Sequence, residues 1–222
     1  MSDDHLRPLR LPPGGQLTRL FLVRHGATAA NEMRPYILQG CEMDNPLSAT
    51  GERQAADLAR LLGDFEFGGI YASPMIRAVQ TATAVAERRS QAVTTLPELR
   101  ECSVGRWEGL SWDQIQERDP DNHRRFFANP VTEPHPGGES YGDVLCRVRP
   151  ALATLFDQHA GQNILVVAHN MVNRVYLAEL AGIELKHARR LKQSNACVNL
   201  LEIRQGELNL ISLNSVLHLS DV

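Results

Sequence analysis

Five side chains in the sequence have the chemistry needed to move a phosphoryl group. Arg24 and His25 are adjacent near the N-terminus, and Arg77, Glu101 and His169 follow at wide spacing. A phosphate dianion is bound by charge-assisted donors such as arginine, and its transfer needs an acceptor and a proton source. A neutral imidazole can accept the group near physiological pH, and a carboxyl group can supply the proton. These residue types therefore predict phosphoryl transfer through an enzyme nucleophile.

Four short apolar runs, typical of strands buried in a parallel sheet, precede these residues. The runs are residues 20–23, 70–72, 93–96 and 163–168. In an open α/β sheet, ligands bind beyond the carboxyl ends of the parallel strands. We therefore expect the two histidines, the two arginines and the glutamate to meet in one pocket at that edge of the sheet.

Helical patterns alternate with these strands. Helices are expected over residues 48–63, 73–86, 140–159 and 171–181, and a closing hairpin over residues 197–203 and 207–213. The second helix has Ser73 as its expected cap and Pro74 at its first position. Alternating strands and helices predict an α/β fold, a three-layer α/β/α sandwich with a mostly parallel central sheet.

The chain divides into a leader, one main domain and an insertion. Residues 1–17 contain paired prolines and glycines and are expected to form a flexible N-terminal extension. Residues 18–222 are expected to form a single domain, long enough to bury one substantial core. Within it, residues 102–138 lack a regular pattern apart from a short helix after Ser111, and they are expected to form a lid over one end of the sheet.

The composition argues against several classes of protein. The 222 residues carry a formal net charge of -3 and no basic stripe, which argues against binding to nucleic acid. No apolar run approaches the roughly 20 residues that span a bilayer, so no membrane partner is expected. The four cysteines lie far apart without a C-x-x-C pair. No zinc knuckle is therefore expected, and reduced thiols fit a cytoplasmic protein.

Four motifs surround the candidate residues. They read R-H-G-A-T-A-A-N at 24–31, S-P-M-I-R-A at 73–78, L-R-E at 99–101 and G-R-W-E-G at 105–109. Together they resemble the histidine phosphatase superfamily (phosphoglycerate mutase-like, branch 1), and the resemblance extends over roughly residues 19 to 214. It implies a phosphoglycerate mutase-like fold and a phosphatase that hydrolyses a small phosphomonoester, such as a sugar phosphate or a similar metabolite.

The resemblance implies a division of labour among the five side chains. His25 would be the nucleophile that receives the phosphoryl group. Glu101 would protonate the leaving oxygen and then help water to attack the phosphohistidine. Arg24, Arg77 and His169 would bind the transferring group and stabilise its charge.

Further substrate-binding positions follow from the same resemblance. Asn31 would donate to the phosphate, and Gln39 and Gly40 are candidates for the rim of the site. Asn170 stands where many members of the family have glycine. A contact from its backbone N–H to the substrate does not depend on the side chain. Neither a metal nor a cofactor is expected, since arginines and histidines supply the positive charge. The expected partner is the small phosphomonoester, with a homodimer as the candidate assembly.

Three other functions fit parts of this pattern. A phosphoglycerate mutase shares the pocket but returns the phosphoryl group to its product, and the segment at 107–111 and the short insertion favour hydrolysis instead. A non-catalytic phosphate-binding module would be expected if His25 or Glu101 were replaced, and both are present. A metal hydrolase is disfavoured because no H-E-x-x-H pattern occurs.

The insertion supplies candidates for contact with the organic part of the substrate. These are Arg106, Trp107, Arg124, Arg125 and Phe126. The histidines outside the motifs, at positions 5, 123, 135, 159, 187 and 218, are expected to be ordinary surface groups.

Overall fold

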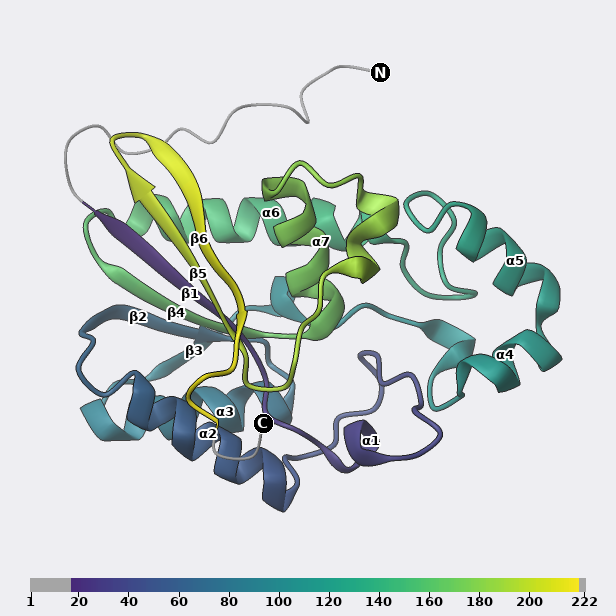
Figure 1. The fold of residues 1–222 in the computed structure, drawn as a ribbon, viewed down its shortest axis with the longest axis horizontal. Coiled ribbons are helices and arrows are strands. Elements are labelled where there is room, and N and C mark those ends of the chain that lie inside the picture. The colour runs from purple at the N-terminus through teal and green to yellow at the C-terminus, as the bar shows by residue number, and fades with distance from the viewer. Residues whose placement is uncertain (1–16, 220–222) are drawn as a thin grey trace.

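A central sheet of six strands organises the chain, in the order β3-β2-β4-β1-β5-β6 (Figure 1). The computed structural model describes residues 17–219. The strands are β1 (Thr18–Arg24), β2 (Phe67–Ala72), β3 (Val93–Thr95), β4 (Asn163–Ala168), β5 (Val198–Arg204) and β6 (Glu207–Ser215). The first four are parallel, and β5 and β6 pair antiparallel. The predicted leader, apart from residue 17, lies outside the described residues.

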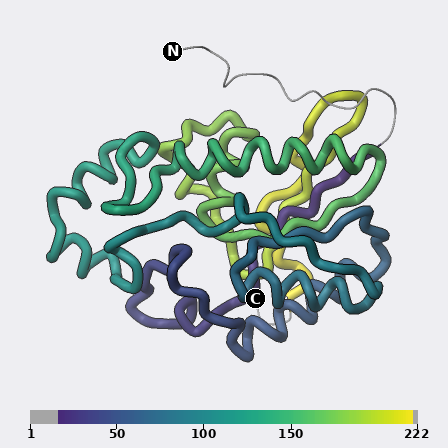
Figure 2. The backbone as a smooth tube through the Cα atoms, turned by 180° about the vertical axis from the view of Figure 1, so that it is seen from behind, coloured from purple at the N-terminus to yellow at the C-terminus, as the bar shows by residue number. Residues whose placement is uncertain are grey.

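Helices cover both faces of this sheet. One face carries α2 (Ala49–Leu61) and α3 (Ile76–Ala86), and the other carries α6 (Tyr141–Gln158) and α7 (Asn170–Leu180). The view from behind in Figure 2 shows the same two helical layers on either side of the strands. The predicted three-layer α/β/α sandwich is therefore confirmed. No helix within residues 17–219 has the length and apolar character needed to cross a bilayer.

The strand β1 shows why the sheet needs two helical layers. Leu20 and Leu22 belong to the core cluster that contains α6 and α7, whereas Phe21 and Val23 belong to the cluster that contains α2 and α3. Successive side chains of a strand point to opposite faces, so a continuous apolar run must be covered on both sides. The strand β4 follows the same rule and is buried from Ile164 onward.

Serine caps fix the starts of several helices as predicted. Ser48 accepts a hydrogen bond from the N–H of Gly51 at the start of α2, and Ser140 forms a capping box with Asp143 at the start of α6. Ser111 does the same with Gln114 for α4 (Trp112–Arg118). These local signals set the directions in which the helices leave the loops.

The predicted start of α3 at Ser73 is wrong. The N–H of Ser73 donates to the carbonyl of Val167 at 2.9 Å, so the chain keeps pairing with β4 for one residue beyond β2. The helix then begins at Ile76, with Met75 as its N-cap. Arg77 consequently lies in the first turn of the helix and close to the sheet edge.

The insertion is more helical than the sequence pattern indicates. Besides α4 it contains α5 (Pro120–Ala128), whose residues are mostly polar and which buries only Phe126. A short helix, α1 (Ala29–Glu32), was also missed. The remaining turns are 3-10 helices: η2 (Glu87–Arg89), η3 (Pro97–Leu99), η4 (Gly105–Trp107) and η5 (Leu185–Arg190). Figure 1 shows α4 and α5 to one side of the sandwich.

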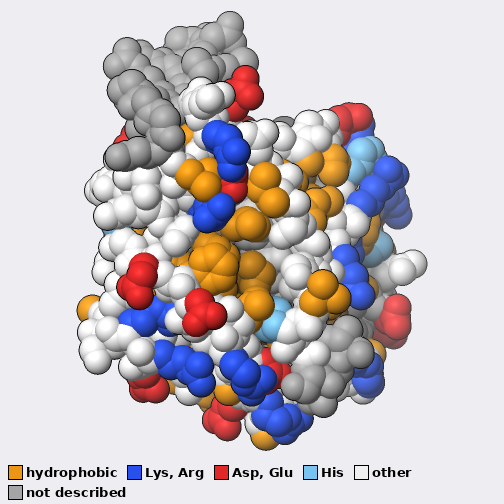
Figure 3. Space-filling model, turned by 60° about the vertical axis from the view of Figure 1, so that its left-hand side comes forward, with side chains coloured by type: hydrophobic (Ala, Val, Ile, Leu, Met, Phe, Trp, Pro, Cys, Tyr) orange, Lys and Arg blue, Asp and Glu red, His pale blue; other side chains and the backbone are white. Residues whose placement is uncertain are grey.

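The strand β6 forms one edge of the sheet and exposes apolar side chains. Ile211 and Leu213 are both exposed there. Figure 3, which brings the left-hand side of Figure 1 forward, shows apolar side chains gathered on one face with Lys and Arg side chains around them. The homodimer expected from the sequence stays a prediction.

Candidate active site

The carboxyl ends of β1, β2 and β4 bring the predicted residues together. The N–H of His25 donates to the carbonyl of Ala168 at 3.0 Å, which aligns the ends of β1 and β4. The rings of His25 and His169 consequently lie with their centroids 5.1 Å apart. Both histidines are buried, with exposed fractions of 3% and 0%. The neighbouring ends of two strands thus place two imidazoles in one buried site.

His25 is held in a single tautomer. Its Nδ1 lies 2.7 Å from the carbonyl oxygen of Gly26, which can only accept, so Nδ1 carries the proton and donates it. The lone pair is therefore on Nε2. Burial lowers the pKa of His25 well below its usual value, and the positive charges of Arg24 and Arg77 lower this pKa further. The ring is consequently neutral and has a free nitrogen.

His169 contributes a second neutral ring. Neither of its ring nitrogens has a hydrogen-bond partner among the described residues, although the side chain is fully buried. Burial lowers the pKa of His169 well below its usual value, and the charge of Arg77 adds to the shift. A buried polar group without a partner costs free energy, which a bound ligand can recover.

Two arginines are held by backbone carbonyls at this site. The Nη1 of Arg24 donates to the carbonyl of Gln193 at 2.7 Å. Arg77 donates from Nη1 to Met43 and from Nη2 to Gly40, both at 2.9 Å. The Nε of each arginine is buried and has no partner among the described residues. Each guanidinium is therefore positioned by the main chain and keeps a donor for an anion.

Glu108 supports the loop that holds Arg77. Its Oε1 accepts hydrogen bonds from the N–H groups of Gly40 at 2.8 Å and Met43 at 3.0 Å. A Cβ on Gly40 would lie 2.9 Å from the backbone carbonyl oxygen of Cys102, so this close approach favours glycine. In the sequence, Glu108 stands out only as part of the G-R-W-E-G motif. The structure assigns it the position behind Arg77.

Glu101 is oriented by backbone donors. Its Oε1 accepts from the N–H of Cys102 at 2.8 Å, and both carboxyl oxygens lie 3.2 Å from the N–H of Met171 in the first turn of α7. The carboxyl group is buried at the cavity wall. These contacts fix the orientation of the Glu101 carboxyl group at the cavity wall.

The other predicted binding residues lie around the same site in different environments. Asn31 accepts hydrogen bonds through Oδ1 from the N–H of Thr28 and from Asn195 Nδ2, both at 3.1 Å. Gln39 and Asn170 line the cavity. The N–H and carbonyl of Gly40 are engaged by Glu108 and Arg77, as described above. The loop residues Gln193 and Asn195 were missed, because they precede β5 without a recognisable motif.

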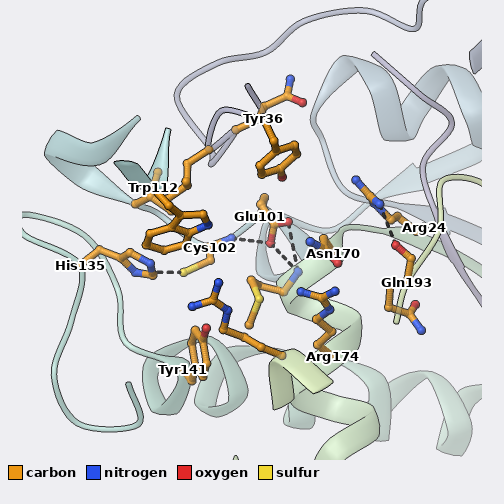
Figure 4. A pocket seen from close by; sticks show the side chains of 15 residues that line it. Arg24, Tyr36, Glu101, Cys102, Trp112, His135, Tyr141, Asn170, Arg174 and Gln193 are labelled. Carbon is orange, nitrogen blue, oxygen red and sulfur yellow. Dashed lines mark hydrogen bonds between the residues drawn. The ribbon is translucent and has the colours of Figure 1, made fainter. Parts of the chain in front are cut away.

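A cavity of about 340 Å³ opens beside these residues. Figure 4 shows Arg24 on one side of it, Trp112 and His135 on the other, and Glu101 between them. Arg24, Gln39, Glu101 and Asn170 are the predicted residues that line it. His25, Arg77 and His169 are buried next to them. We refer to the end of the cavity near Arg24 as the phosphate end and to the end near Trp112 as the lid end, after the functions expected of them.

None of the five residues of the insertion expected to contact the substrate lines the cavity. Trp107 and Phe126 are each only 1% exposed and pack in the main core cluster, so neither lines the cavity. Trp112 and Tyr36 supply aromatic lining instead. Arg106, Arg124 and Arg125 are exposed and do not line the cavity.

His135 also departs from its expected surface position. The side chain is buried, lines the cavity and donates from Nδ1 to the carbonyl of Glu139 at 2.7 Å. Burial lowers the pKa of His135 to about 4. His5 lies outside the described residues. Within residues 17–219, no group of three His, Cys, Asp or Glu side chains is arranged to hold a metal ion.

Comparison with known proteins agrees with this geometry. A model of the histidine phosphatase superfamily (branch 1) matches residues 20–216. The chain belongs to this family. It is 33% identical over 215 residues to a metal-independent phosphoserine phosphatase of Arabidopsis thaliana. The aligned region covers 93% of this chain and 85% of the relative.

Two further relatives extend the comparison. Phosphoserine phosphatase 1 of Hydrogenobacter thermophilus is 29% identical over 205 residues, 92% of this chain and 96% of the relative. The crystal structure of phosphoserine phosphatase in complex with 3-phosphoglyceric acid from Entamoeba histolytica superposes with a TM-score of 0.81 at 27% identity, over 91% and 99% of the two chains. The relatives are phosphatases, and this histidine phosphatase is a phosphoric monoester hydrolase.

Proposed function

We propose that the chain hydrolyses a small phosphomonoester through a phosphohistidine formed on Nε2 of His25. The observation that carries the proposal is the hydrogen bond from Nδ1 of His25 to the carbonyl of Gly26. This bond leaves Nε2 unprotonated in a ring that burial, together with two nearby arginines, keeps neutral. A buried, neutral imidazole with a fixed lone pair is a competent nucleophile.

The reaction takes place in two balanced steps. First, Nε2 of His25 attacks phosphorus, the bond between phosphorus and the ester oxygen breaks, and Glu101 gives its proton to the leaving alcohol. Second, a water molecule attacks the phosphohistidine while the Glu101 carboxylate takes a proton from it. The P–N bond breaks, inorganic phosphate leaves, and both side chains return to their starting state.

The surrounding donors stabilise the charge on the transferring group. The unpartnered Nε groups of Arg24 and Arg77 and an N–H of His169 are available to the phosphoryl oxygens. Asn31 is available from the opposite loop, since its Nδ2 makes no hydrogen bond among the described residues. Donors that are already positioned favour the transition state, because they need no reorganisation during the reaction.

The test is direct detection of the phosphoryl group on His25. The full-length protein, mixed with a radiolabelled phosphomonoester and quenched in base, is expected to carry an acid-labile, base-stable label on His25. His25→Ala should lose the label and turnover together, and His123→Gln, a control in the insertion, should keep both. If the wild type carries the label and yet isomerises 3-phosphoglycerate to 2-phosphoglycerate faster than it releases inorganic phosphate, that result would indicate a mutase. Absence of the label, with turnover retained in His25→Ala, would refute the mechanism.

We also propose a reducing, cytoplasmic setting for this reaction. Four free cysteines support it, and two of them, Cys102 and Cys197, are buried. Burial raises the pKa of Cys197 to about 11 and that of Cys102 well above its usual value, so both remain protonated thiols at neutral pH. Cell fractionation with an antibody to the native protein would test the location.

A further inference from the structure

Two arginines line the cavity without a part in the chemistry described above. Arg174 belongs to α7 and Arg189 to η5. Together with Arg24 they place three guanidinium groups on the cavity wall, and Glu101 is the one carboxylate among the lining residues. The wall therefore carries more positive charge than the phosphate end alone explains.

Arg174 is held in place but not neutralised. Its Nε donates to the carbonyl of Leu191 at 2.7 Å, which leaves its terminal nitrogens for another partner. No ion pair joins it to a carboxylate within the described part of the chain. Burial lowers the pKa of Arg174, and the charges of Arg24 and Arg189 lower this pKa further. Arg174 is thus close enough to Arg24 and to Arg189 to be repelled by each.

Arg189 is held by aromatic rings instead of by an acid. Its guanidinium carbon lies 4.6 Å from the ring centre of Trp112 and 4.7 Å from that of Phe127. The two rings contact each other edge to face, with centroids 5.2 Å apart, so they pack on the guanidinium from one side and leave N–H groups for an anion. Arg189 likewise has no ion pair with a carboxylate in residues 17–219. The side chain is consequently preorganised for a partner that the protein does not supply.

We propose that Arg174 and Arg189 form a second anion site, which binds a carboxylate or a second phosphoryl group on the organic part of the substrate. The proposal rests on the phosphatase function proposed above and narrows its substrate class. A planar guanidinium pairs with either anion through two parallel hydrogen bonds. The cavity of about 340 Å³ is near the lower end of the roughly 300–1,000 Å³ of small-molecule sites. The substrate is therefore a compact metabolite with two anionic ends.

The test measures binding in the catalytically inert His25→Ala protein, so that turnover does not interfere. One pair of ligands is 3-phosphoglycerate and glycerol 3-phosphate, which differ by a carboxylate in place of a hydroxymethyl group. A second pair is the bisphosphate and the monophosphate of propane-1,3-diol. In at least one pair, calorimetry should show that the ligand with two anionic groups binds about tenfold or more tighter than the ligand with one. The favoured pair identifies the second anion as a carboxylate or a phosphoryl group.

Added substitutions locate the site. Arg174→Met and Arg189→Met should each reduce the affinity ratio of the favoured pair by about tenfold. Arg190→Met, which removes an exposed neighbouring charge, should leave the ratio unchanged. Equal affinities within both pairs, or an equal loss for both members when either arginine is replaced, would overturn the proposal. A wild-type protein that releases phosphate without forming a phosphohistidine, while both arginine substitutions still lower the ratio, would instead count against the proposed chemistry alone.

Discussion

The phosphate end and the lid end of the cavity are built from different kinds of contact. At the phosphate end, His25 and Arg77 donate to backbone carbonyls of loops that follow buried strands. At the lid end, Arg189 packs against the rings of Trp112 and Phe127. Backbone contacts persist when neighbouring side chains change, whereas a contact between side chains depends on each partner. We therefore expect the sheet to fix the chemistry and the insertion to be the part that sets the choice of substrate.

The largest effect is expected at the phosphate end, from Glu101→Ala. Loss of the proton donor should slow turnover of an alkyl phosphate on the order of 100- to 10,000-fold. Para-nitrophenyl phosphate should be affected much less, because its leaving group needs little protonation. Steady-state kcat for the two substrates measures the difference, and Glu133→Ala is a control in the insertion. Equal losses for both substrates would remove Glu101 from the proton-transfer step.

The lid end can be perturbed separately through His135. Because its pKa falls to about 4 in the folded protein, the unfolded chain binds a proton first as the pH drops below about 6.5. Stability is therefore lost as the pH falls from about 6.5 toward 4, by about 3 kcal/mol for this group. His135→Gln cannot titrate and should lose less of its free energy of unfolding over that interval. Urea unfolding at pH 7 and pH 4.5 measures this, and a variant as acid-sensitive as the wild type would contradict it.

A smaller effect is expected from Glu108, which positions Arg77 from behind. Glu108→Ala should free the loop at 40–43 and weaken vanadate binding by about tenfold, roughly the value of one charge-assisted hydrogen bond. Glu108→Gln should recover most of the affinity, since its amide oxygen can still accept from Gly40 and Met43. Thermal unfolding of both variants distinguishes a loss of support for Arg77 from a general loss of stability. Similar vanadate affinity in the wild type and Glu108→Ala would show that Arg77 does not depend on this support.

The smallest effect is expected from metal removal. Arg24 and Arg77 supply positive charge at the phosphate end, so EDTA should leave turnover unchanged. The measurement is phosphate release before and after chelation. Activity that disappears in EDTA and returns with a divalent ion would show that the arginines are not sufficient.

The phosphate end could be predicted from the sequence because its signals are local. Each strand is a short apolar run, and the residues that follow it carry the reactive groups, so His25 and His169 could be placed at one sheet edge before any coordinates. Parallel strands bring such positions together whatever the loops do. The pairing of β1 with β4 accounts for the short distance between the two rings.

The lid end could not be predicted in the same way. Trp107 and Trp112 are five positions apart and have the same chemistry, yet Trp107 packs in the core and Trp112 lines the cavity. The choice depends on a 3-10 turn at Gly105–Trp107 and on a polar helix, α5, that shows little apolar periodicity. His135 is buried for a similar reason, because its environment comes from distant aromatic residues. Tertiary packing decides these positions.

The hydrogen bonds that connect Glu108 to Arg77 through the loop at 40–43 also indicate where segments of related chains could be exchanged. Glu108 holds the loop that fixes Arg77 through its side chain. The residues just after Gly109 meet the same loop through the backbone, because the N–H of Leu38 donates to the carbonyl of Leu110 at 2.9 Å. A chimaera that exchanges residues 110–134 keeps this link within one parent. A crossover placed before Glu108 combines the carboxylate of one parent with the loop of another. We therefore expect that an insertion taken from a relative is best joined after Gly109. There the substrate specificity can be changed while Glu108 and the loop that holds Arg77 stay together.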